Sequence, residues 1–343
     1  MKKILSIIIA LVLLLSGCSK RNIEVGNVVL SYLNSLNVKK SKLIDIDYEA
    51  ISKYESLTIN ADLAYVSSSI DEVLEPFYEF QNSDTTVAKG DIVLWSCEIY
   101  NSSNALIHTE KDAKVLVGSS NFECLEQKMI SKNIGDELIL SPEKSLCDFF
   151  SIEDSCSMKV SITGILKYIE KDETDIFLDK QGFTSLVDFY NYLFAMKVSE
   201  YEYEQNSKIA DEFLDFSVEK SSFYISEDDL KNYTQQVVKD NMDAATSLGI
   251  TIEEYYTRLL SLDEDGFYLM CAETAEKEIQ NALVIGALSQ YNNIQVEKSA
   301  FDDYCSRNNI DTDDLTSRSL VEYYCLKSAV IKKYTGVSIL GWV

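Results

Sequence analysis

Residues 90–100 read Gly-Asp-Ile-Val-Leu-Trp-Ser-Cys-Glu-Ile-Tyr, residues 115–126 read Val-Leu-Val-Gly-Ser-Ser-Asn-Phe-Glu-Cys-Leu-Glu, and residues 135–142 read Gly-Asp-Glu-Leu-Ile-Leu-Ser-Pro. A fourth apolar run extends from Met158 to Tyr168. Apolar runs of this length, separated by Gly, Ser, Asn and Asp, are typical of a small antiparallel sheet. Residues 121–130 lie between two of the runs and predict one short helix. Together these residues predict a half-open sheet folded over a single helix, which forms an apolar cup.

The order and spacing of these residues resemble the FKBP-type peptidyl-prolyl isomerase domain, in the form found inside trigger factor. The shared features are Gly-Asp before the first strand, Gly-Ser and Phe-Glu around the short helix, Gly-Asp-Glu before the third run and the proline after it. The resemblance covers residues 86–170. It implies an FKBP-like fold and a pocket that binds prolyl segments of polypeptides.

Isomerisation of an X-Pro bond has a barrier of about 18–20 kcal/mol. Lowering this barrier requires a dry pocket that holds the proline ring, and neither a nucleophile nor a metal. We therefore expect no catalytic acid, base or nucleophile, no metal and no cofactor. The resemblance implies pocket positions at Trp95, Cys97, Leu106, Phe122, Leu125, Phe149, Phe150 and Ile162.

The predicted pocket contains fewer aromatic residues than the family pattern. Cys97, Leu106, Leu125 and Ile162 stand where that pattern has aromatic side chains, and Ser145 replaces the tyrosine that follows the proline by three residues. Core packing explains Phe122 and Leu125 equally well, and it explains Cys97 better than a pocket role does. The sequence thus predicts an isomerase with a partly degenerate pocket, whose activity is weak or limited to some clients.

The N-terminus carries the pattern of an export signal. Lys2 and Lys3 precede an apolar run, residues 4–15, which is shorter than the roughly 20 residues that span a bilayer. The run ends in Leu-Ser-Gly-Cys at residues 15–18, which matches the bacterial lipobox. We expect residues 1–17 to be a lipoprotein signal peptide and Cys18 to be lipidated, which would anchor the protein to the membrane outside the cytoplasm. An ordinary secretory signal with an incidental cysteine is the alternative.

From residue 171 onward the apolar period changes from 2 to 3.6, which indicates helices. Capping boxes are predicted at Ser226 with Asp229 and at Thr251 with Glu254. The predicted helices are a long one after Thr184, one from Ser226 to about Gly249, one over 263–291, and two shorter ones over 297–308 and 317–334. Their order and spacing resemble the C-terminal chaperone domain of trigger factor. Residues 18–85 are predicted to form a tether and a short N-terminal segment, and the Gly-Phe-Arg loop of the family's ribosome-binding domain is absent from them.

Charge and cysteine content exclude several classes of function. The net charge of −25 disfavours nucleic-acid binding, because phosphate backbones are also negative. His108 is the only histidine and no C-x-x-C spacing occurs, so a zinc site is not expected. Seven cysteines besides Cys18 leave at least one thiol unpaired, and Cys147 with Cys156 is one candidate disulfide.

The sequence therefore predicts an α+β protein with an FKBP-like antiparallel sheet domain and an all-α, trigger factor-like C-terminal domain. The expected domains are the signal peptide (1–17), the tether and N-terminal segment (18–85), the isomerase-like domain (86–170) and the helical domain (171–343). The expected function is that of an extracytoplasmic, membrane-anchored folding factor, acting as an isomerase, as a chaperone for unfolded or newly secreted polypeptides, or as both. No contact with nucleic acid or the ribosome is expected. The alternative is a non-catalytic surface-binding or assembly lipoprotein on the same scaffold.

Overall fold

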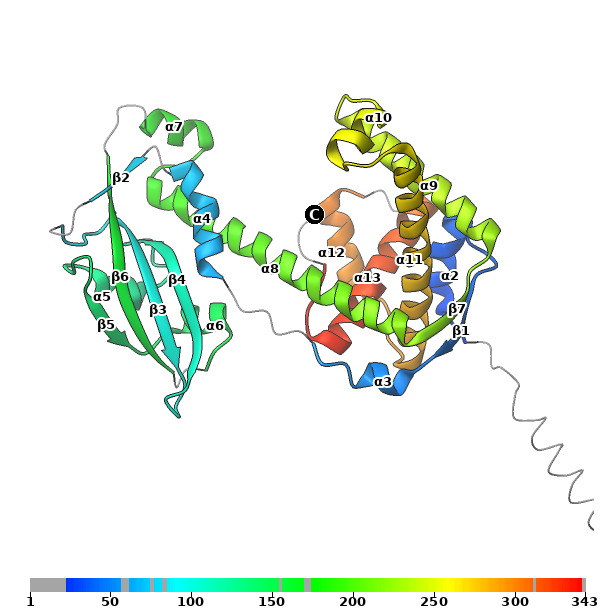
Figure 1. Cartoon of the computed structure of the whole chain (residues 1–343), viewed down its shortest axis with the longest axis horizontal. Coiled ribbons are helices and arrows are strands. Elements are labelled where there is room, and N and C mark those ends of the chain that lie inside the picture. Colours follow the sequence, from blue (N-terminus) through cyan, green and yellow to red (C-terminus); the bar gives the residue numbers. More distant parts are fainter. Residues whose placement is uncertain are drawn as a thin grey trace, which may run out of the picture. The chain divides into compact units, whose positions relative to one another are not determined.

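The structure is a computed structural model, and it describes residues 23–56, 62–74, 77–81, 85–153, 156–169, 174–310 and 313–340. The chain divides into two compact units, which are treated separately here (Figure 1). Residues 58–205 form the sheet unit, and residues 1–57 together with 206–343 form the helical unit. The predicted α+β class is confirmed, since a β-sheet and a set of long helices occupy different units.

The sheet unit contains five antiparallel strands, in the order β2-β6-β3-β4, with β5 also paired to β6. In β3, every second residue from Val93 to Ile99 is buried, which is the burial expected of a central strand. This alternation explains why the four apolar runs form a sheet. The strands are β2 (Tyr78–Phe80), β3 (Ile92–Tyr100), β4 (Leu106–Leu116), β5 (Glu137–Leu140) and β6 (Ser157–Tyr168).

More helices pack on this sheet than the single helix that the sequence predicted. The short helix expected within residues 121–130 is α5, but α4 also packs on β4 and buries Leu63, Val66 and Ile70. Because α4 and the start of α8 share the core of the sheet, the compact unit extends beyond the predicted range 86–170 at both ends. The helices are α4 (Leu63–Leu74), α5 (Glu123–Met129), α6 (Lys144–Phe150), α7 (Thr174–Gln181) and the first part of α8 (Leu186–Glu219).

The helical unit is built around α11, in which residues 281–289 are all buried. A helix that is buried on all sides needs neighbours on all sides, and the N-terminal segment supplies some of them. The predicted helices after residue 184 are confirmed, with ends within about two residues of expectation. The elements are α2 (Gly26–Ser35), β1 (Lys42–Ile46), α3 (Tyr48–Ser52), the second part of α8, β7 (Ser221–Tyr224), α9 (Glu227–Ser247), α10 (Ile252–Glu254), η3 (Tyr255–Leu259), α11 (Glu264–Tyr291), α12 (Lys298–Asn308) and α13 (Leu315–Thr335).

The N-terminal segment belongs to the core of the helical unit. Strand β1 pairs with β7 in antiparallel register, and the ring of Tyr32 in α2 stacks on Tyr323 of α13 with centroids 3.9 Å apart. Gly286 of α11 allows the backbone of Val25 to approach so closely that an added Cβ would lie 2.3 Å from the Val25 carbonyl oxygen. Residues 25–46 therefore belong to the helical unit, which contains the small β1–β7 sheet beside its helices.

Candidate functional site

Six of the eight predicted pocket residues lie in the core of the sheet unit. Leu106 is 54% exposed at the start of β4, and Phe149 is partly buried against the core. The structure thus places seven of the eight residues in or against one apolar cluster. Leu106 is the remaining residue, and it is exposed on the surface. The six core residues, none more than 6% exposed, are Trp95, Cys97, Phe122, Leu125, Phe150 and Ile162.

The first part of α8 covers the predicted pocket near Phe122. The ring of Phe194 meets the ring of Phe122 edge-on, with centroids 5.7 Å apart. Beside this contact, the Asn191 amide donates to the Ser119 carbonyl at 3.2 Å and accepts from the Asn121 amide at 3.2 Å. Aromatic residues at helical spacing in α8 indicated a buried face, but nothing in their pattern indicated that this face covers the cup.

Helix α6 fills the same region from another side. The segment after Pro142 forms this helix, and its residues Leu146 and Phe150 are buried. The Glu143 carboxylate accepts a hydrogen bond from the Leu125 backbone N–H at 3.2 Å, which joins α6 to α5. In this conformation the cup is closed by the protein's own side chains.

Glu126 organises the turn that carries Phe122. This carboxylate is 3% exposed and accepts hydrogen bonds from the backbone N–H groups of Gly118, Ser120 and Phe122 at 2.8–3.0 Å, and from the Ser119 hydroxyl at 2.8 Å. A buried carboxylate needs such donors to offset its desolvation. Glu126, four residues after Phe122, thus has a structural role in shaping the rim of the cup.

An open hollow of about 810 Å³ lies along β4, the edge strand of the sheet. Leu106 is the one predicted pocket residue in its lining, next to Ile107, which is 44% exposed. Within the hollow, the Glu110 carboxylate accepts hydrogen bonds from the backbone N–H groups of Leu63 and Ala64 at 3.1 and 3.2 Å and so caps α4.

Helices α9 and α11 are joined by α10 and η3 (Figure 1), and this part of the chain carries five exposed apolar side chains. We call residues 242–269 the arm tip. Its fold is held by the predicted capping box, which is confirmed: the Thr251 hydroxyl accepts from the Glu254 N–H at 3.1 Å, and the Glu254 carboxylate accepts from the Thr251 N–H at 3.2 Å. The exposed apolar residues are Met242 (47%), Leu248 (60%), Leu259 (57%), Tyr268 (49%) and Leu269 (60%).

The arm tip combines these exposed residues with a rigid base. Phe267 is 1% exposed, and its ring stacks on Tyr256 with centroids 5.3 Å apart. Residues Tyr255 to Leu259 adopt a π-helical turn, a conformation that occurs often at functional sites. The surface is also acidic, since residues 239–270 contain two basic and seven acidic side chains, a balance of 2 − 7 = −5.

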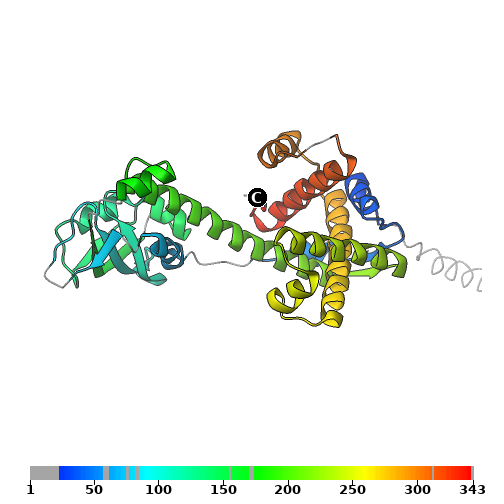
Figure 2. The same cartoon turned by 90° about the horizontal axis from the view of Figure 1, so that it is seen from above.

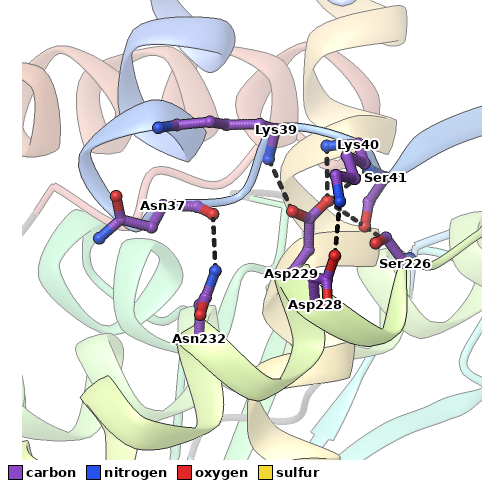
Figure 3. Close-up of polar contacts among 8 residues, drawn as sticks. All are labelled: Asn37, Lys39, Lys40, Ser41, Ser226, Asp228, Asp229 and Asn232. Atoms are coloured by element: carbon purple, nitrogen blue, oxygen red, sulfur yellow. Dashed lines mark hydrogen bonds and ion pairs between the residues drawn. The ribbon is translucent and has the colours of Figure 1, made fainter.

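Asp229 joins the N-terminal segment to α9 (Figure 3). Its carboxylate accepts hydrogen bonds from the backbone N–H groups of Lys39, Lys40 and Ser41 at 3.0, 2.6 and 2.5 Å, and from the Ser41 hydroxyl at 2.8 Å. Burial opposes ionisation of Asp229, but these hydrogen bonds outweigh it and hold its pKa below the usual value. The predicted Ser226–Asp229 capping box is wrong, because the N-terminal segment takes up the carboxylate and the Ser226 side chain forms no cap bond.

The remaining sequence predictions concern the N-terminal signal, membrane and metal sites, and the candidate disulfide. Residues 1–17 and Cys18 lie outside the described residues, so the signal peptide and lipidation stay predictions. Among the residues that the structure describes, no helix is long and apolar enough to cross a membrane, and no cluster of metal-ligating side chains occurs. Cys147 and Cys156 are both buried, and the Cys147 thiol donates a hydrogen bond to the Pro142 carbonyl oxygen at 3.6 Å.

Comparison with known proteins finds a family match in the helical part of the chain. Residues 185–307 match the family model described as bacterial trigger factor protein C-terminus. The trigger factor of Halothermothrix orenii is 25% identical over 192 residues, which cover 54% of this chain but only 44% of that protein. A solved structure from work on promiscuous substrate recognition by the trigger factor chaperone covers 84% of this chain and 72% of its own, at 17% identity and a TM-score of 0.30. Residues 185–307 are therefore similar to the C-terminal region of bacterial trigger factor, and the chain spans less than half the length of the curated relative that it matches.

Proposed function

We propose that this protein is a folding factor that holds unfolded polypeptides on the arm tip of its helical unit. The observation that carries the proposal is the set of five large apolar side chains that the arm tip exposes on a rigid base. Grouped exposed apolar residues mark binding surfaces more often than scattered ones do. The arm tip also lies within the range that matches the trigger factor family.

The charge around these residues supports a particular class of client. Exposed carboxylates of Asp243, Glu253 and Asp265 lie among the apolar residues of the arm tip. Such a surface attracts cationic segments and repels acidic ones. We therefore propose that preferred clients are apolar segments flanked by Lys or Arg.

The test is suppression of aggregation. A chemically unfolded basic protein, diluted into buffer with an equimolar amount of the mature chain, should stay in solution longer than without it. Addition of salt should weaken the effect, because the charge contribution is screened. Failure to protect any unfolded client, together with tight binding to one folded partner, would favour the alternative of a surface-binding lipoprotein.

We propose further that the protein works outside the cytoplasm, tethered through a diacylglyceryl group on Cys18. The support is the basic start, the short apolar run and the Leu-Ser-Gly-Cys sequence at residues 15–18. We expect Cys18→Ala to move the protein from the membrane fraction to the soluble exported fraction, or to leave it unprocessed. Mass spectrometry of the wild-type N-terminal peptide should show the lipid, and an unmodified Cys18 in the membrane fraction would contradict the prediction.

Isomerase activity is the second function that we propose for this chain, in a form that requires the cup to open. It is supported by the sheet folded over α5, by the apolar cluster of predicted pocket residues, and by the Trp95 indole N–H, which is buried without an acceptor among the described residues. A client carbonyl could accept this hydrogen bond once the cup opens.

Removing the Phe194 side chain, which covers the cup, should therefore raise the isomerase activity. We expect Phe194→Ala to expose Phe122 and to increase prolyl isomerisation of a short peptide severalfold over the wild type. Tyr192→Ala is the matched control, because Tyr192 lies on the same helix but is 53% exposed and should change little. Background rates for all three proteins, with circular dichroism unchanged, would leave the chain a holding chaperone only.

A further inference from the structure

Helices α12 and α13 are the orange and red helices in Figure 2. They share a small apolar core of their own. Its fully buried members are three: Cys305 of α12, with Val321 and Cys325 of α13. Two of the three are thiols, although the whole chain has only eight cysteines. The partly buried residues packed around them are Val296, Phe301, Tyr304, Ile310 and Leu340.

This core is small for a helix of eleven residues. In α12 only Cys305 is buried, Phe301 and Tyr304 are partly buried, and most of the other residues are polar or charged. Its ion pairs, Lys298 with Asp302 and Arg307 with Asp303, connect residues one turn apart within the helix and do not reach α13. Exposed pairs of this kind add little stability. The attachment of α12 therefore depends mainly on the core that contains the two thiols.

The two thiols are also near enough to affect each other's ionisation. Burial raises the pKa of Cys325 to about 11, and the charge of Cys305 is the next largest cause. Of the other thiols among the described residues, Cys97 and Cys156 lie in the large core of the sheet unit, Cys147 is buried in α6 of that unit, Cys124 is exposed, and Cys271 lies in the main helical core. Cys305 and Cys325 are thus the pair that one small core brings together.

We propose that Cys305 and Cys325 form a disulfide that fastens α12 to α13. The inference rests on the proposed location outside the cytoplasm, where thiols meet oxidising partners. The oxidant is a dithiol oxidoreductase in its disulfide form. The thiolate of one cysteine attacks one sulfur of that disulfide and forms a mixed disulfide. The second cysteine then attacks the bound sulfur of its neighbour and releases the oxidoreductase as a dithiol. One S–S bond forms, two thiol protons leave, and the oxidoreductase takes up the two electrons.

The bond would change the local stability of α12 rather than the whole fold. It closes a loop of about 20 residues. By restricting the open chain, such a loop lowers the equilibrium constant for opening of α12 roughly a hundredfold. In the reduced protein α12 should open about a hundred times more often. The oxidised protein should keep α12 on α13 while the main helical core, which lies around α11, stays unchanged.

The first experiment tests bond formation without reference to export. The purified full chain is equilibrated with oxidised and reduced glutathione, alkylated in denaturant and digested. We expect a cross-linked peptide pair that contains Cys305 and Cys325, with the mass of two hydrogen atoms missing. The chain with Cys271→Ala should still form the pair, whereas chains with Cys305→Ala or Cys325→Ala should not.

The second measurement follows hydrogen exchange of α12 in the same samples. Reduction should speed exchange in residues 298–308 by about a hundredfold and leave α11 unaffected. Full alkylation of both thiols across all glutathione ratios would overturn the inference, and so would a different cysteine pair. If the pair forms in glutathione but is reduced in protein isolated from cells, the proposed location is wrong and the disulfide inference stands as a property of the fold.

Discussion

Replacing Asp229 with Ala should lower the free energy of unfolding of the helical unit by about 3 kcal/mol or more. The substitution leaves the backbone N–H groups of Lys39, Lys40 and Ser41 without their acceptor, and a hydrogen bond to a charged group contributes about 1.5–3 kcal/mol. Because these groups connect the N-terminal segment to α9, the first effect should be local. We expect residues 25–46 to lose hydrogen-exchange protection before the rest of the unit does.

Asp228→Ala is the matched control. Asp228 is adjacent in sequence and pairs with the Lys40 ammonium at 2.5 Å, but both side chains are more than 60% exposed. An exposed pair contributes about 0–1 kcal/mol, so this variant should unfold in urea almost like the wild type. Equal destabilisation by the two substitutions would show that the backbone hydrogen bonds to Asp229 are not the important contribution.

The Asp229 contribution should also depend on pH. Its pKa in the folded protein is below the usual value of about 3.9, so folding favours the ionised form. The stabilisation is therefore complete above pH 5 and is lost as the pH falls through the folded pKa. The difference in unfolding free energy between the wild type and Asp229→Asn should be constant from pH 5 to 7 and should shrink below about pH 4.

The second large effect concerns the arm tip. Leu248, Leu259 and Leu269 are each at least 57% exposed, and burying such a side chain against a client contributes about 1.5–3 kcal/mol at most. A third of the upper value from each of the three residues amounts to roughly a hundredfold in affinity. We expect the triple change to Ser to weaken binding of an unfolded client about a hundredfold and to abolish suppression of its aggregation.

A matched triple variant controls for general loss of exposed leucine. Leu30, Leu315 and Leu320 also lie in the helical unit and are 47%, 77% and 37% exposed, but they belong to α2 and α13. Their replacement by Ser should leave client binding unchanged within about threefold. Affinities can be compared by anisotropy of a labelled apolar peptide flanked by lysines. Equal losses in both triple variants, or no loss in either, would remove the arm tip from the proposed function.

Local patterns predicted much of the secondary structure correctly. The spacing of Leu269, Ala272, Ala275 and Ile279 located α11, and the Thr251–Glu254 box located the start of α10, because both signals lie within a few residues of one another. The short helix after Phe122 and the strands around Trp95 were indicated in the same way. These are features that neighbouring residues determine largely by themselves.

Long-range contacts were not predictable from such patterns. Asp229 lies at the right spacing for a capping box with Ser226, yet its carboxylate binds backbone groups some 190 residues away in the sequence. Likewise, the aromatic positions of α8 indicated a buried face but not that Phe194 would cover Phe122. Periodicity reports that a side chain is buried, and it carries no information about the partner that buries it.

The pairing of β1 with β7 has a consequence for the order in which the protein folds. Leu43 of β1 pairs with Phe223 of β7, which lies 223 − 43 = 180 positions later because the whole sheet unit comes between them in the sequence. At about 5–20 residues per second, a ribosome needs roughly 10 to 40 seconds to make that interval. During this time the apolar face of α2 lacks the helices α11 and α13 that bury it, so the helical unit can be completed only after its last helices have been synthesised.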